Sequence, residues 1–166
     1  MNLKINLAEK AKTLALLNKV KSMKNSTFDI KISNSHIIEL NKKIEKKIFK
    51  KESLYISSTT ICDLMKPIGG KNQHNYHGLT AEDIYLSLIS IKDPQYVFFV
   101  KDKRYAIISV KLSSFYYPMM MVIETNSGAV SGKDTSINKI ITMYPKSYID
   151  EYIEKLDKRK LLYKKK

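Results

Sequence analysis

The chain has 166 residues, a length that suits one domain or one domain with an extension. Hydrophobic residues make up 43% of it, enough for a core, but no apolar run is long enough to predict a membrane span. The first residues lack the pattern of a signal peptide, and Cys62 is the single cysteine, so we expect a cytoplasmic protein without an internal disulfide.

The formal net charge of +14 comes from 30 lysine and arginine residues against 16 acidic residues. Such an excess of positive charge favours a polyanionic partner, above all nucleic acid. The chain is also rich in Ile, Asn and Tyr, which an AT-rich genome supplies together with Lys. Compositional drift is therefore the alternative source of the charge.

The N-terminal part of the chain is predicted to be mainly helical. Apolar residues recur at helical spacing over residues 7–23 and again over 34–50, with a short alternating strand at 28–32 between them. The second helix carries the densest lysine run, which is more typical of a solvated face than of a nucleic-acid contact. We interpret residues 1–52 as a helical extension and residues 53–166 as the main domain.

The main domain is predicted to place helices first and an antiparallel meander afterwards. Thr80 is a good N-cap for a helix that Pro94 ends, and Ser147 is the expected cap of a C-terminal helix. This order predicts an α+β fold, with N-terminal helices followed by a four-stranded antiparallel sheet and a C-terminal helix. The expected meander strands are 96–100, 105–112, 118–125 and 137–144; short strands at 54–57 and 160–163 and helices at 58–65 and 148–156 complete the prediction.

The strand expected over residues 137–144 carries several polar side chains. Because side chains alternate along a strand, Asn138, Thr142 and Tyr144 should share one face, and Lys139 should point to the other. An amide, a hydroxyl and a phenol in a row suit hydrogen bonding to a phosphate. An ordinary solvated strand face is the alternative, because Thr and Tyr are favoured there in any case.

The histidines differ in what they suggest. His77 precedes the helix that begins near Thr80, close to the positive end of a helix dipole, where a phosphate contact and proton exchange are both favourable. An ordinary loop histidine is the alternative, and His36 is expected on a helix surface. His74, His77 and Cys62 lack the spacing of a strong metal site, so no metal is expected.

Two other local patterns bear on nucleic acid. The pairs Phe98-Phe99 and Tyr116-Tyr117 are of the kind that stack on bases, although paired aromatics in strands more often divide between core and surface. The Gly69-Gly70-Lys71 stretch is too short for a phosphate-binding P-loop and is interpreted as a turn.

The order of these segments points to a family. His77-Gly78-Leu79-Thr80-Ala81-Glu82-Asp83-Ile84 opens a helix, Asp93-Pro94 precedes a strand, and Leu161-Leu162-Tyr163 closes the domain. Between them, Ile137-Asn138-Lys139-Ile140-Ile141-Thr142-Met143-Tyr144-Pro145-Lys146 follows an Asn-x-(Ile/Val)-x-(Ser/Thr)-x-Tyr strand pattern. In these features residues 54–163 resemble the phage-associated branch of the barnase–EndoU–colicin–RelE-like nuclease superfamily. That branch includes domains fused to MuF-type phage head proteins and toxin domains.

The resemblance implies helices packed on a four-stranded antiparallel sheet. It also implies RNA cleavage without a metal or other cofactor, in which the ribose 2′-hydroxyl attacks the adjacent phosphate. Carried over by position, His77 is the implied acid/base group, and Thr142 and Tyr144 are the implied hydrogen-bond donors to the phosphate, with Tyr144 also a proton donor. Asn138 is implied to orient the substrate or the strand. The cations implied to bind substrate are Lys139, Lys146, Arg104 and Lys111.

Two other interpretations stay open. Some members of the superfamily have lost their catalytic residues, which would leave a nucleic-acid-binding module without activity. A phage structural or interaction protein would instead work through its N-terminal helices. RNA is the expected partner, with an antitoxin or a phage protein as a further one; no membrane partner is expected, and the sequence indicates no particular oligomeric state.

Overall fold

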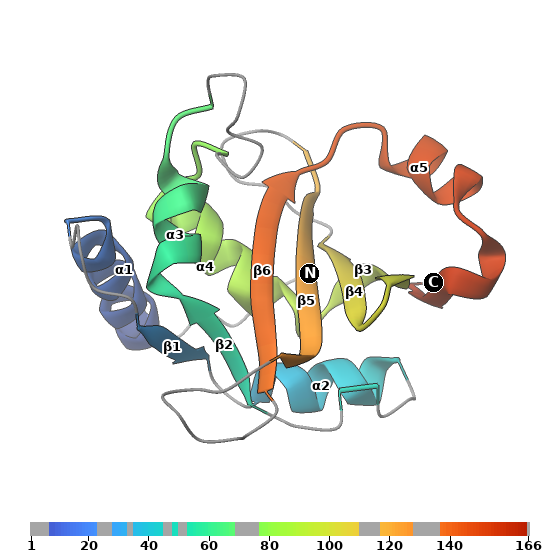
Figure 1. Ribbon diagram of the computed structural model, residues 1–166, viewed down its shortest axis with the longest axis horizontal. Helices are drawn as coiled ribbons and strands as arrows, with labels where there is room; N and C mark the ends of the chain where they lie inside the picture. The colour runs from blue at the N-terminus through green and yellow to red at the C-terminus, as the bar shows by residue number, and fades with distance from the viewer. Residues whose placement is uncertain are drawn as a thin grey trace.

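The computed structural model describes residues 7–22, 28–32, 35–44, 48–49, 53–68, 77–109, 117–127 and 137–165 (Figure 1). These residues form an α+β fold with five α-helices and one mixed sheet. The helices are α1 (Leu7–Ser22), α2 (Ser35–Lys43), α3 (Ser58–Met65), α4 (Ala81–Ser90) and α5 (Ile149–Lys155), with a short 3₁₀ helix, η1 (Lys158–Lys160). The strands are β1 (Asp29–Ile32), β2 (Leu54–Ser57), β3 (Pro94–Lys101), β4 (Arg104–Ser109), β5 (Met119–Ser127), β6 (Ile137–Pro145) and β7 (Leu161–Lys164).

The sheet has seven strands in the order β1-β2-β6-β5-β4-β3-β7. Strands β2 and β6 run parallel, and all other neighbouring strands run antiparallel. The prediction of a four-stranded antiparallel sheet was therefore wrong, although the α+β class is confirmed. Strands β3 to β6 make up the predicted meander. The extra strands β1, β2 and β7 join through contacts distant in sequence, which local periodicity does not reveal.

Each face of the sheet packs into its own apolar cluster. On one face, Ile107, Ile123 and Ile140 belong to a core that also contains side chains of α1, α2, α3 and α4. On the other face, Phe98 and Val122 pack with α5. In Figure 1, α5 lies to the right of the central strands, whereas α1 and α3 lie to their left. Among the described helices, α5 is thus the one that contributes to the second cluster.

The segment before residue 53 is joined closely to the rest. Strand β1 extends the sheet by pairing with β2, with Ile30 opposite Ile56. Leu17 and Val20 of α1 are buried in the main core. The boundary drawn at residue 52 stays a prediction, but the described part of this segment shares both the sheet and the core. No helix among the described residues has the length and apolar character needed to cross a bilayer.

The helix starts test the capping predictions directly. Thr80 caps α4 as predicted: its Oγ1 accepts a hydrogen bond from Asp83 N at 3.1 Å, and its N donates to Asp83 Oδ2 at 2.8 Å. The prediction of Ser147 as the cap of α5 was wrong. Tyr148 occupies that position in a left-handed conformation, with φ 54° and ψ 45° and no side-chain capping bond.

Candidate functional site

His77 lies just before α4 in a loop that is fixed to the end of α3. Gly78 N donates to Lys66 O at 2.8 Å, and Leu79 N donates to Leu64 O at the same distance. Gly78 has a φ of 61°, in the left-handed region that favours glycine. These constraints hold the half-buried His77 beside β6.

The structure brings His77 together with Thr142 and Tyr144 of β6. The Nε2 atom of His77 lies 3.3 Å from Thr142 Oγ1, within hydrogen-bond reach. The His77 and Tyr144 rings have centroids 5.4 Å apart and are tilted by 32°. Three polar side chains from two distant segments thus meet at one place, next to the carboxyl end of β6.

A small polar groove adjoins this group of side chains. It lies between the start of α3 and the middle of β6, has a volume of about 140 Å³, and includes Thr142 in its wall. Ser57 Oγ caps α3 by accepting from Thr60 N, and it lies 2.8 Å from Thr60 Oγ1, so both hydroxyls line the groove. The lining residues are Ser57, Thr59, Thr60, Asp63, Leu64, Ile141 and Thr142.

The hydroxyl side of the groove was missed in the sequence. The signal was the run Ser57-Ser58-Thr59-Thr60 at a helix start, where hydroxyls are expected for capping alone. Nothing in the local pattern indicates that β6 passes beside α3, because the parallel β2–β6 pairing brings them together.

Burial sets the protonation states of the two titratable groups. Desolvation lowers the pKa of His77 from its ordinary value of 6.5, so the imidazole is neutral at neutral pH. Desolvation, with a smaller effect of nearby Tyr152, raises the pKa of Tyr144 from 10.0, so its phenol stays protonated. The site therefore holds a neutral imidazole and a neutral phenol side by side.

A bulge in β6 changes which residues share a face. Val122 pairs with Thr142 but Ile123 pairs with Ile140, so Ile141 is an extra residue in the ladder. The prediction that Asn138 shares a face with Thr142 and Tyr144 was therefore wrong.

The packing on the two sides of the bulge agrees with this register. Ile140 packs in the main core, whereas Ile141 and Tyr144 pack with the second cluster. Asn138 is opposite Leu54 of the main core. Lys139 is opposite Glu124, on the same side of the sheet as the site and not on the opposite one.

Asn138 supports the sheet from within. It is only 2% exposed, and its Nδ2 donates to Ser53 O at 3.1 Å, while its backbone N also donates to that oxygen. These contacts join β6 to the start of β2. Of the two implied roles for this residue, the geometry favours orienting the strand.

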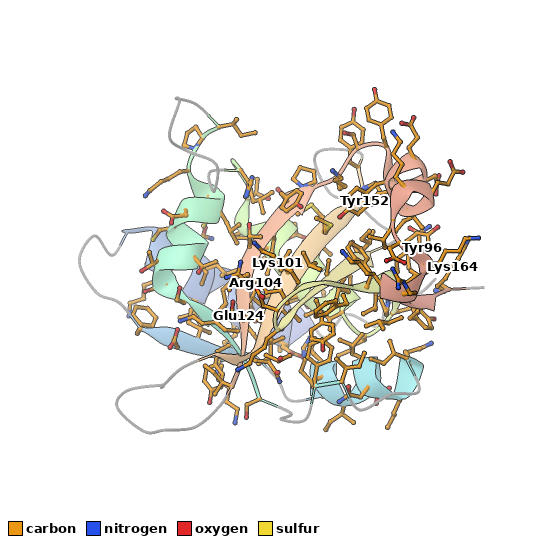
Figure 2. All side chains as sticks on the ribbon, turned by 45° about the vertical axis from the view of Figure 1, so that its right-hand side comes forward. Tyr96, Lys101, Arg104, Glu124, Tyr152 and Lys164 are labelled. Atoms are coloured by element: carbon orange, nitrogen blue, oxygen red, sulfur yellow. The ribbon has the colours of Figure 1, made fainter. Side chains whose placement is uncertain are left out.

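The cations implied to bind substrate differ in their surroundings. Lys139 forms an ion pair with Asp29 at 3.2 Å, and Arg104 Nε donates to Glu124 at 2.7 Å, as Figure 2 illustrates for the second pair. Both charges are thereby compensated within the sheet. Lys146 Nζ lies 4.7 Å from the centre of the Tyr152 ring, at the end of β6 near Tyr144. Lys111 lies outside the described residues.

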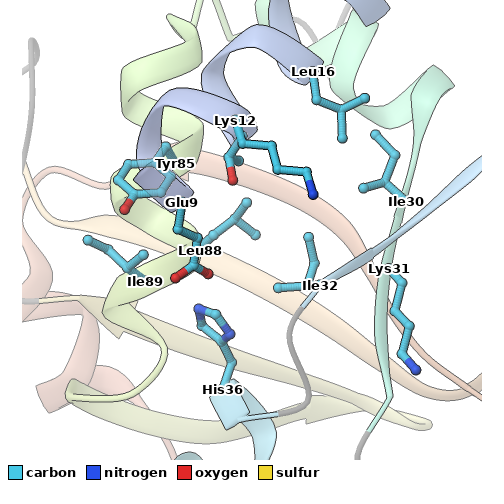
Figure 3. A pocket seen from close by; sticks show the side chains of 11 residues that line it. Glu9, Lys12, Leu16, Ile30, Lys31, Ile32, His36, Tyr85, Leu88 and Ile89 are labelled. Atoms are coloured by element: carbon cyan, nitrogen blue, oxygen red, sulfur yellow. The ribbon is translucent and has the colours of Figure 1, made fainter. Parts of the chain in front are cut away.

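A second cavity, of about 200 Å³, lies between α1, β1 and α4 (Figure 3). Its walls are largely apolar, and the His36 imidazole points into it. His36 is 3% exposed, so its prediction as a surface residue was wrong. None of the side chains predicted for the site lines this cavity. Within the described residues, no cluster of three or more His, Cys, Asp or Glu side chains has a geometry that suits a metal ion.

Comparison with known proteins bears on residues 69–166, which match the model of the phage MuF C-terminal domain. The chain belongs to this family. The match covers more than half of the chain and contains His77, Thr142 and Tyr144. This phage MuF C-terminal domain protein is thus phage-related, as the sequence predicted. No curated protein and no solved structure matches it.

Proposed function

We propose that this protein is a metal-independent endoribonuclease that cleaves RNA through attack of a ribose 2′-hydroxyl on the adjacent phosphate. The observation that carries the proposal is the meeting of His77 with Thr142 and Tyr144, side chains that the nuclease-superfamily resemblance implies. The 3.3 Å separation of His77 Nε2 and Thr142 Oγ1 lets one phosphodiester contact both groups.

His77 is the proposed general base. Its lowered pKa keeps the imidazole neutral at neutral pH, and in the tautomer with the hydrogen on Nδ1 the lone pair of Nε2 accepts the 2′ proton as the oxygen attacks phosphorus. The anchored loop holds the ring in place before substrate arrives, which lowers the cost of positioning. Thr142 then donates its hydroxyl hydrogen to a non-bridging phosphate oxygen, where negative charge increases in the transition state.

Tyr144 is the proposed general acid. Its raised pKa keeps the phenol protonated, and an alkoxide leaving group is a stronger base than the phenolate that remains. Proton transfer from Tyr144 to the departing 5′ oxygen is therefore favourable. The products are a 2′,3′-cyclic phosphate and a free 5′-hydroxyl. Because His77 and Tyr144 carry out both proton transfers, the proposed reaction uses no metal or cofactor.

The chemistry predicts the substrate class. RNA supplies the internal nucleophile and DNA does not, so DNA should bind to the basic chain without being cleaved. The net charge of +14 supports a polyanionic substrate. An antitoxin or a phage protein remains the proposed macromolecular partner, on the strength of the superfamily resemblance.

The test is cleavage of a labelled single-stranded RNA in EDTA, with the same oligonucleotide carrying one 2′-deoxy position at the cut site. We expect cleavage of the RNA, a cyclic phosphate end, and no cut at the deoxy position. Activity that His77→Ala leaves unchanged would overturn the proposal. Salt-sensitive binding without any cleavage would instead support a binding module.

A further inference from the structure

Two exposed tyrosines lie at the end of the sheet that carries Tyr144. Tyr117 precedes β5 and is 50% exposed, and Tyr148 follows β6 and is 76% exposed. A hydrogen bond of 2.8 Å from Lys146 N to Pro118 O joins their two segments. The start of β5 and the end of β6 therefore lie side by side, as Figure 1 also shows.

The backbone of Tyr148 is strained. Its φ of 54° and ψ of 45° are in the left-handed region, where a side chain with a Cβ is disfavoured and glycine is not. The side chain makes no capping bond to α5, so the start of that helix does not account for a tyrosine here. Strain of this kind concentrates at functional positions, and its effect here is to present a largely exposed ring.

A cation belongs to the same two segments: Lys146 is two residues before Tyr148, and its backbone N donates to Pro118 O, next to Tyr117. Lys146 Nζ is 4.7 Å from the centre of the Tyr152 ring, which holds the ammonium group at this end of β6. The pair Phe98-Phe99 offers no comparable exposed rings. Phe98 is fully buried, and Phe99 makes an edge contact with Tyr105, with centroids 5.6 Å apart.

We propose that Tyr117 and Tyr148 form a stacking platform for unpaired bases of single-stranded RNA, with Lys146 contacting the phosphate between them. The proposal rests on the proposed function, since the platform would receive nucleotides next to the cleaved phosphate. Bases in a duplex are already stacked and present no free face, so the platform selects single strands. Every base has a π-face, so the platform tolerates different sequences.

The test separates binding from cleavage by using a 2′-O-methyl oligonucleotide, which lacks the nucleophile. Its affinity is measured as a single strand and as a duplex, for the wild-type protein and for Tyr148→Ala, Tyr148→Phe and Tyr148→Gly. Leu7→Ala is the matched control, because Leu7 is 77% exposed on α1, outside the proposed platform. The melting temperature of each variant is recorded beside its affinity.

We expect Tyr148→Ala to weaken single-strand binding about 10-fold, the effect of losing one stacked base, and Tyr148→Phe to retain it. Tyr148→Gly should lose as much affinity while its Tm stays at or above that of the wild type, because glycine relieves the left-handed strain. That combination attributes the loss to the ring and not to unfolding. Tyr117→Ala should act in the same direction.

Single-strand binding equal to wild type in both Tyr148→Ala and Tyr117→Ala would overturn the platform, as would an equal loss of duplex binding. If the wild-type protein cleaves RNA and these variants bind normally, the platform fails and the proposed nuclease stands. If binding depends on the tyrosines but no RNA is cleaved, the platform stands and the nuclease fails.

Discussion

The imidazole of His77 lies within hydrogen-bond reach of the Thr142 hydroxyl, although the two residues are 65 positions apart in the sequence. This contact joins the loop before α4 to the strand β6 and defines the candidate site. It also makes the proposed chemistry testable one residue at a time, because His77 and Thr142 can each be replaced without removing a core side chain.

Replacement of His77 by alanine should reduce kcat on RNA by about 10²–10⁴-fold, the usual contribution of a general base. The half-buried ring makes a modest contribution to packing, so the fold should persist. The measurement is steady-state cleavage of a labelled RNA, with circular dichroism to confirm folding. A folded His77→Ala protein with full activity would exclude this residue as the base.

The pH dependence of kcat/KM should show a broad plateau. Burial lowers the pKa of His77 from 6.5 and raises that of Tyr144 from 10.0, so the base and acid forms coexist between those values. Activity should therefore fall only below the lowered pKa of His77, as the imidazole gains its proton. Initial rates from about pH 4.5 to 9 test this, and an acidic limb centred above 6.5 would contradict it.

The Tyr144→Phe change removes the proposed acid and keeps the ring beside His77. In the wild-type protein the Tyr144 hydroxyl donates to Met120 Sδ, with the oxygen 3.8 Å from the sulfur. Sulfur is a weak acceptor, so losing this bond should change stability little. We expect kcat to fall by about 10²-fold with KM nearly unchanged, because the proton is needed in the transition state. Tyr163→Phe, in β7, is the control and should leave kcat unaltered.

Asn138→Ala should act on stability, because the amide is buried and donates to Ser53 O. The backbone N of residue 138 would still donate to that oxygen, so the loss of the side-chain hydrogen bond should lower the free energy of unfolding by about 0.5–1.5 kcal/mol. Urea denaturation measures the change. Activity per folded molecule should be close to normal, and a selective loss of RNA affinity in a stable variant would restore a direct substrate role.

Gly78→Ala should reduce both stability and activity. A Cβ at this position would meet its nearest neighbour, in Ile68, at 3.9 Å, so the cost comes from the φ of 61° and not from a clash. We expect about 1–2 kcal/mol of destabilisation and a displaced His77. Gly78→Asn, which tolerates this conformation better, should lose less in both thermal denaturation and cleavage assays.

Local patterns predicted the parts of the fold that depend on neighbours in sequence. The Thr80 cap, the strand containing Thr142 and the positions of the meander strands all follow from residues within a few positions. The bulge at Ile141 did not, because an extra residue is recognised only against the partner strand β5. For that reason the face assigned to Asn138 was wrong.

Which of the candidate cations are free to bind substrate was also hard to predict, because their ion-pair partners are distant in sequence. Lys139 and Arg104 look available in the sequence, but their partners, Asp29 and Glu124, lie on other strands. The meeting of His77 with Thr142 was anticipated through the family resemblance. The adjoining groove was not, because it depends on the parallel pairing of β2 with β6.

That parallel pairing has a consequence for modularity. The family match begins at residue 69, but β6 hydrogen-bonds to β2, which ends at Ser57. A fragment limited to the matched residues would leave β6 as an open edge, with unpaired backbone groups beside Ile140, and such edges recruit strands from other chains. The segment that the family match covers and the unit that folds thus differ in length here. A relative that keeps only the matched region would need a donor strand, from its own chain or from its partner.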